Sequence, residues 1–158
     1  MQHAYRDDLA YIHDAGFGHL ATSVVPVILE ELNHAGSLGG TIVDFGCGSG
    51  IMSRLLYDAG YKVVGFDLSE PLLQMARKRV PGATFRMESF VTADIPPCIA
   101  VTAIGEVFNY TFDTANSAAV RAKTFSRVYK ALAPGGLFVF DMAGPARAPS
   151  HNLERTFT

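Results

Sequence analysis

The sequence predicts an α/β fold built on a doubly wound, mostly parallel β-sheet. Short apolar segments typical of strands alternate with longer segments of helical periodicity, and this order favours parallel strands joined by crossover helices. The segment 99–104 is apolar apart from Thr102, as expected of a strand buried on both faces. The chain has 158 residues, of which 49% are hydrophobic and 18% charged, so we expect one domain with a hydrophobic core.

Two helices are expected before the first strand. Residues 4–14 have a helical pattern, and the glycines on either side of Phe17 should end it. A second helix is expected at 24–34, because Pro26 would fall in its first turn, where proline is tolerated. Residues 1–36 together form a predicted N-terminal helical segment.

The core begins with two strands separated by a helix. Strand 41–45 leads through a glycine-rich loop into helix 50–59, which has its apolar residues on one face and ends at Gly60. Strand 62–66 follows directly. The order strand, helix, strand is that of a parallel pair with a crossover helix.

The next helix is predicted at 70–79, with Ser69 as its N-cap and a proline in its first turn. Its expected buried face consists of Leu72, Leu73, Ala76 and Val80. A Pro-Gly turn then leads into strand 84–87, and a proline-containing loop precedes strand 99–104.

The last helix is predicted at 117–132, where Val120, Thr124, Val128 and Leu132 fall in one row. The segment Ala-Pro-Gly-Gly at 133–136 should form the turn into strand 137–140. The predicted core unit is 37–143, and 144–158 is expected to be an irregular C-terminal tail of the same domain.

Composition and charge exclude several classes of function. The net charge is −2 without a basic run, so no nucleic-acid partner is expected. No apolar run reaches the roughly 18 residues that span a bilayer, and the N-terminus lacks the apolar core of a signal peptide, so we expect a cytoplasmic protein without a membrane partner. Cys47 and Cys98 suit a reduced protein better than a disulfide, and the scattered histidines predict no metal site.

The loop after strand 41–45 is the strongest indication of a binding site. Glycines alternate at Gly46, Gly48 and Gly50, and glycine permits positive φ and close approach of the backbone to a ligand. The loop opens onto a helix N-terminus, whose N–H groups lack partners within the helix. A tight turn without a ligand is the alternative. The dinucleotide fingerprint would need glycine or alanine where the chain has Ile51.

A second acidic residue follows the next strand. Asp67 should lie at the same sheet edge as the glycine loop, where a carboxylate can accept hydrogen bonds from a ribose diol. The alternative is that Asp67 helps to cap the helix that follows. A ribose diol occurs in more than one nucleotide, so Asp67 alone does not select the ligand.

The pattern Asp44-x-Gly-x-Gly-x-Gly50, and Val63–Ser69 followed by Leu72–Arg77, resemble the class I methyltransferases that use S-adenosylmethionine (AdoMet). The resemblance implies a Rossmann-like methyltransferase fold with strand order 3-2-1-4-5, and AdoMet as cofactor with S-adenosylhomocysteine as product. An acidic residue near the loop would favour the ammonium of AdoMet. The implied cofactor-binding residues are Asp44, Gly46, Cys47, Gly48, Gly50, Asp67, Leu68, Ser89, Phe90, Gly105 and Glu106.

The resemblance also assigns the adenine contacts. Ser89 or Glu88 would meet the edge of the base, and Phe90 its face. Many relatives have an aspartate at the position of Ser89, so here a hydroxyl would bond the exocyclic amine. The alternative for Phe90 is a purely structural role in the core.

No catalytic residue is identified. Glu106, His13 and Tyr110 are candidates by position for a base, which methyl transfer needs only if the acceptor must lose a proton. Residues 11–18 resemble the lid of many small-molecule methyltransferases, in which Tyr5, His13 and Phe17 could touch the ligand. An ordinary amphipathic helix is the alternative.

Members of this family usually have seven strands, and this chain has room for five. We therefore expect either a fragment that lacks the C-terminal strands or a homodimer that covers the edge of the fifth strand. The predicted function is AdoMet-dependent methylation of a small molecule. A non-catalytic AdoMet-binding module or an NAD-dependent oxidoreductase are the alternatives. The sequence leaves open the acceptor and whether O, N, C or S is methylated.

Overall fold

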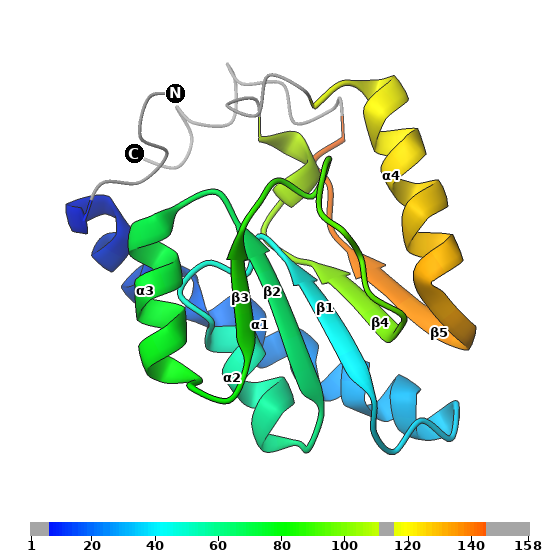
Figure 1. Ribbon diagram of the computed structural model, residues 1–158. Coiled ribbons are helices and arrows are strands. Elements are labelled where there is room, and N and C mark those ends of the chain that lie inside the picture. The colour runs from blue at the N-terminus through cyan, green and yellow to red at the C-terminus, as the bar shows by residue number, and fades with distance from the viewer. Residues whose placement is uncertain (1–6, 111–115, 145–158) are drawn as a thin grey trace, which may run out of the picture.

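The protein is described by a computed structural model covering residues 7–110 and 116–144, with the helical backbone alone for residues 7–17. Within these ranges a single five-stranded parallel sheet has the order β3-β2-β1-β4-β5 (Figure 1). The predicted fold class and strand order are therefore confirmed. The strands are β1 Thr41–Phe45, β2 Lys62–Asp67, β3 Thr84–Met87, β4 Cys98–Ala103 and β5 Leu132–Phe140.

Helices cover both faces of the sheet, as Figure 1 shows. The helices are α1 Asp7–His34, α2 Ile51–Asp58, α3 Glu70–Arg79 and α4 Ala118–Ala131, with a short 3-10 turn η1 at Val107–Asn109. Helices α1 and α2 form one apolar cluster with residues of β1, β2 and β4, and α3 packs beside them. Helix α4 lies on the opposite face, where its side chains join a cluster rich in phenylalanine.

The first helix differs from its prediction, because α1 is continuous from Asp7 to His34 and places Pro26 in its interior. A glycine in a helix costs only about 1 kcal/mol relative to alanine, which packing can offset. A Cβ atom at Gly18 would lie 3.3 Å from Cδ1 of Ile51, so this glycine allows α1 to pack closely on the start of α2. The expected break at Phe17 is therefore wrong, and the predicted contact residue Tyr5 lies outside the described residues.

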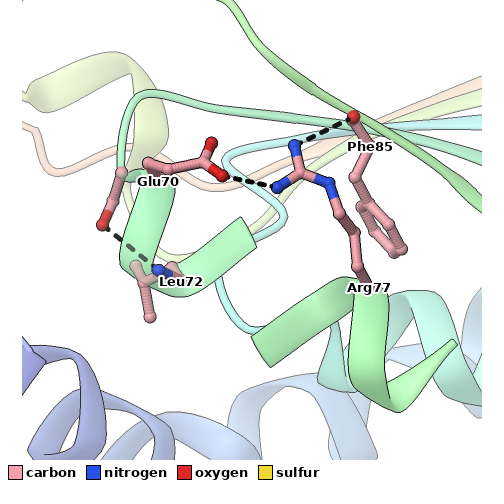
Figure 2. Close-up of polar contacts among 5 residues, drawn as sticks. Glu70, Leu72, Arg77 and Phe85 are labelled. Atoms are coloured by element: carbon pink, nitrogen blue, oxygen red, sulfur yellow. Dashed lines mark hydrogen bonds and ion pairs between the residues drawn. The ribbon is translucent and has the colours of Figure 1, made fainter. Parts of the chain in front are cut away.

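Helix α3 forms as predicted. The Ser69 hydroxyl caps it by accepting a hydrogen bond from the Leu72 N–H at 3.4 Å, and the predicted inner face is buried. Figure 2 shows the two contacts of the Arg77 guanidinium: it donates to a Glu70 carboxylate oxygen within α3 at 2.7 Å and to the Phe85 carbonyl of β3 at 3.4 Å. The bond to Phe85 links α3 to β3, and the bond to Glu70 holds the guanidinium in place.

The last strand also differs from its prediction. Strand β5 begins at Leu132, and the expected turn at 133–136 is a bulge within it. Cys98 of β4 pairs with Leu132, whereas Ala100 pairs with Leu137, so the extra residues bulge out between these two pairs. A bulge of this kind accommodates the segment that contains the glycines, and the strand continues beyond it.

All five strands run in the same direction, so their carboxyl ends meet at one edge of the sheet. The loops at this edge carry almost all of the predicted site residues.

Cys47 and Cys98 are both buried free thiols. Within the described ranges, no helix is long and apolar enough to cross a membrane. The same part of the chain contains no group of three potential metal ligands from His, Cys, Asp and Glu.

Candidate functional site

A cavity opens at the carboxyl edge of the sheet, beside the loops that follow β1, β2, β3 and β4. Most residues that the sequence assigned to the site line this cavity: Asp44, Gly46, Cys47, Gly48, Asp67, Leu68, Glu88, Ser89, Phe90, Gly105 and Tyr110. Gly50 and Glu106 do not belong to the lining. Gly50 instead packs under α3, where an added Cβ would lie 3.0 Å from Cβ of Ala76.

The glycine loop has the backbone conformation that its sequence predicts. Gly46 and Gly48 have φ values of 65° and 53°, a region that side chains disfavour. The two positions differ in their surroundings. A Cβ at Gly46 would lie 2.6 Å from Cγ2 of Val107, whereas nothing lies within 4 Å of a Cβ at Gly48.

Two side chains of opposite charge hold neighbouring residues of this loop. Asp67 at the end of β2 accepts a hydrogen bond from the Gly48 N–H at 2.9 Å. Arg79 at the end of α3 donates to the Ser49 carbonyl at 2.5 Å and to its hydroxyl at 2.8 Å. The conformation of the loop therefore depends on two residues far from it in sequence, and no local motif predicts the role of Arg79.

Asp67 makes the helix-capping contact that was the alternative for it, and it also lies where a ligand could reach it. Its other carboxylate oxygen accepts a hydrogen bond from the Ser69 N–H at 2.8 Å, at the start of α3. Asp67 also lines the cavity. A carboxylate accepts up to about four hydrogen bonds, so these N–H contacts do not preclude bonds to a ligand.

Asp44 is buried, with 1% of its surface exposed, and is one of the residues that line the cavity. One oxygen accepts from the Ser53 hydroxyl at 2.8 Å and the other from the Thr102 hydroxyl at 2.9 Å. Burial raises the pKa of Asp44 from 3.8 to about 6, although the two hydroxyl donors oppose this shift and the nearby Asp67 adds to it. A cation in the cavity would favour the ionised carboxylate.

This raised pKa predicts a specific pH dependence of stability. The folded chain binds a proton at Asp44 near pH 6, whereas the unfolded chain does so only near pH 3.8, so the contribution of Asp44 to the free energy of unfolding falls as pH rises from about 4 to 6. In Asp44→Asn we expect that decline to be absent. Urea unfolding of both proteins between pH 4 and pH 8 measures the difference, and parallel curves would contradict the prediction.

The loop after β3 forms another part of the cavity wall, with Glu88, Ser89 and Phe90. Ser89 Oγ accepts a hydrogen bond from the Val91 N–H at 3.0 Å, which starts a tight turn. The Phe90 side chain is 7% exposed and packs edge-on against Phe108 at a centroid distance of 5.1 Å. Phe90 therefore belongs to the core and to the cavity wall at once.

The segment after β4 completes the cavity. Asp141, at the end of β5, accepts hydrogen bonds from the N–H groups of Gly105 and Glu106 at 2.8 and 2.9 Å. Glu106 has a φ of 58°, which these bonds help to maintain. Of the three candidate bases, Tyr110 lines the cavity, Glu106 does not, and the side chain of His13 lies outside the described part.

Helix α1 also contributes to the cavity wall, which its sequence did not predict. Leu20 and Ala21, just beyond the expected helix break, line the cavity together with Ile51 and Met52 from the start of α2. The predicted lid residue Phe17 lies in α1, where its backbone alone is described. The other lining residues without an earlier assignment are Ser49, Phe66, Ile104 and Val107.

Comparison with known families decides the identity of the fold. The sequence model of a family described as a methyltransferase domain matches residues 42–136, which is more than half of the chain. The chain belongs to this methyltransferase family. The match runs from the second residue of β1 through the cavity loops to the bulge of β5.

Curated relatives of the methyltransferase domain are longer proteins. Trans-aconitate 2-methyltransferase of Acidovorax sp. (strain JS42) is 37% identical over 120 residues, which cover 72% of this chain and 42% of that protein. The putative methyltransferase YqeM of Bacillus subtilis (strain 168) is 32% identical over 108 residues, covering 65% and 42%. The chain thus spans less than half the length of these relatives.

Solved structures share the fold of the methyltransferase domain. The sugar N-methyltransferase KedS8 from Streptoalloteichus sp ATCC 53650 has a TM-score of 0.74 at 19% identity, over 93% of this chain and 57% of that one. SAM-bound CalS10, an amino pentose methyltransferase from Micromonospora echinaspora, has a TM-score of 0.68 at 23% identity, over 94% and 61%. At these identities the likeness establishes the fold alone.

Proposed function

We propose that this methyltransferase domain binds AdoMet and transfers its methyl group to a small-molecule acceptor. The observation that carries the proposal is the position of Asp67, whose carboxylate lines the cavity and is bonded to the Gly48 N–H at 2.9 Å. A carboxylate beside a glycine loop with positive φ supports binding of a ribose diol close to the backbone. Membership of the family supports AdoMet as the nucleoside.

The chemistry of the cavity suits the parts of AdoMet. Asp44 and Asp67 supply negative charge for a cationic ligand. Apolar side chains at Leu68 and Phe90 offer a surface for a flat base. The open space at Gly48 leaves room for a ligand to approach the loop backbone.

In this proposal the chain acts mainly by positioning. AdoMet, when bound, supplies a methyl group on a sulfonium that needs no further activation. Bringing an acceptor into line with that methyl group can account for roughly 7–11 kcal/mol of the barrier. Tyr110, which lines the cavity, is the best-placed of the three candidate bases if the acceptor must lose a proton.

A small-molecule acceptor is supported by the names of the relatives, which include methyltransferases of trans-aconitate, a sugar and an amino pentose. We also propose a cytoplasmic location, testable by cell fractionation.

The outer edge of β5 has no strand beside it in the described sheet, which supports pairing with a second copy of the chain. Sedimentation equilibrium of the domain would measure that association.

The two alternatives make different predictions. An NAD-dependent oxidoreductase is disfavoured because Ile51 stands where the dinucleotide fingerprint needs a small residue, and because Ile51 itself lines the cavity. A non-catalytic module would bind the same ligand as the enzyme without transferring its methyl group.

Calorimetric titration with AdoMet, S-adenosylhomocysteine and NAD tests the proposal. We expect saturable binding of both adenosyl ligands and none of NAD. Binding of NAD alone would overturn the assignment of the cofactor. Transfer of labelled methyl from AdoMet to a panel of carboxylic acids and amino sugars then separates an enzyme from a binding module.

A further inference from the structure

The cavity wall after β3 is a single turn rather than a helix or strand. Ser89 forms the hydrogen bonds at the N-terminal end of this turn. Its carbonyl accepts from the N–H groups of Thr92 and Ala93 at 3.0 and 2.8 Å, and its hydroxyl accepts from the Val91 N–H. A turn this short cannot provide internal partners for its own last carbonyls. Those carbonyls need donors from elsewhere in the fold.

Arg127 of α4 supplies those donors. Its guanidinium donates to the carbonyls of Phe90 at 3.4 Å, Val91 at 2.5 Å, and Ala93. The planar guanidinium presents five N–H groups in a fixed arrangement, which suits it to several carbonyls at once. The contacts span more than thirty positions in sequence and link α4 to the cavity wall.

The same backbone unit connects Arg127 to a cavity-lining hydroxyl. The Val91 carbonyl accepts from Arg127, and the Val91 N–H donates to Ser89 Oγ. Arg127 itself is not part of the lining, whereas Ser89 and Phe90 are. The Phe90 ring is fixed separately by its edge-on contact with Phe108, so Arg127 chiefly orients the main chain that carries the Ser89 hydroxyl.

We propose that Arg127 is a positioning residue for recognition of the purine base, acting through the 89–93 turn. The inference rests on the proposed binding of AdoMet, in which Ser89 meets the exocyclic amine of adenine. Removing the guanidinium would leave the Val91 carbonyl without this donor. The Ser89 hydroxyl, which is bonded to the N–H of the same residue, would then no longer be held in one orientation. The consequence is specific: discrimination of the base weakens more than affinity for the rest of the nucleoside.

The test compares S-adenosylhomocysteine with its 6-deamino analogue, whose purine carries only a hydrogen atom at C6, because a hydroxyl can bond either an amine or a carbonyl at that position. Calorimetry is carried out on the wild-type chain, Arg127→Gln, Arg127→Lys and the control Lys123→Gln, which removes one positive charge from an exposed position of the same helix. In Arg127→Gln we expect affinity for S-adenosylhomocysteine to fall about tenfold, the loss of roughly one hydrogen bond, with little change for the 6-deamino ligand, which has no C6 group for Ser89 to bond. Arg127→Lys should be intermediate, and Lys123→Gln should resemble the wild type.

An equal loss of affinity for both ligands would show a merely structural role and overturn the assignment, as would an unchanged ratio of affinities. If Arg127→Gln does not unfold cooperatively, the ratio in Arg127→Lys decides in the same way. Wild-type protein that binds neither ligand would overturn the proposed function and the role of Arg127 with it. Wild-type binding with an unchanged ratio in the variants overturns the role of Arg127 alone.

Discussion

Asp67→Ala should weaken binding of S-adenosylhomocysteine about 100-fold, equivalent to roughly 2.7 kcal/mol. Each hydrogen bond between a charged carboxylate and a ribose hydroxyl contributes about 1.5–3 kcal/mol. The same substitution removes the acceptor that holds the Gly48 N–H at 2.9 Å, so the loop beneath the ligand would lose part of its order. Both losses act on the same binding step, and we therefore expect a large effect.

Calorimetric titration measures this change, and thermal unfolding by circular dichroism shows whether the variant is folded. Asp58→Ala is a suitable control, because it removes a carboxylate from an exposed ion pair with Arg54 at the far end of α2. The control should leave the affinity unchanged. Asp67→Asn keeps one oxygen acceptor and should fall between Asp67→Ala and the wild type.

A folded Asp67→Ala protein that binds S-adenosylhomocysteine as tightly as the wild type would exclude a ribose contact. The carboxylate would then serve only the glycine loop and the start of α3, where it accepts from the Ser69 N–H at 2.8 Å. A loss of affinity in Asp58→Ala of similar size would point to a general effect of net charge.

The fold could be predicted because its main signals are local. The apolar strands, the Ser69 cap and the buried face of α3 each follow from short stretches of sequence. The two errors have the opposite origin. At Gly18 the contact with Ile51 outweighs the low helix propensity of glycine, and at 133–136 pairing with β4 continues through a segment whose composition is typical of a turn.

The candidate site could be predicted in part for the same reason. Glycines and acids at strand ends are visible as motifs, whereas their supporting partners are not. Thr102 bonds Asp44 across 58 positions, and Asp141 holds the loop of Gly105 across 36. Thr102 is visible only as the one polar residue of an apolar strand, and nothing local marks Asp141, because the role of each arises only when the strands lie side by side. Ser53 lies nine positions from Asp44 on α2, and the expected placement of that helix beside the strand could have suggested it.

Gly46→Ala should lower the free energy of unfolding by about 3 kcal/mol, a large share of the roughly 5–15 kcal/mol typical of a domain. Two costs combine at this position. A non-glycine residue at a φ of 65° costs roughly 1–2 kcal/mol, and a Cβ 2.6 Å from Cγ2 of Val107 forces the packed side chain to move, which costs roughly 1–3 kcal/mol. Urea unfolding followed by circular dichroism measures the total.

Gly48→Ala separates the two costs, because Gly48 has a φ of 53° but nothing within 4 Å of an added Cβ. It should lose only about 1 kcal/mol, from the backbone conformation alone. A double-mutant cycle gives the same separation at Gly46 itself. In a Val107→Ala background the clashing methyl groups are absent, so adding Gly46→Ala should cost about 1 kcal/mol rather than 3. Equal losses in Gly46→Ala and Gly48→Ala, with no coupling to Val107, would mean that the backbone conformation alone selects glycine at both positions and that contact with the segment after β4 does not constrain the loop.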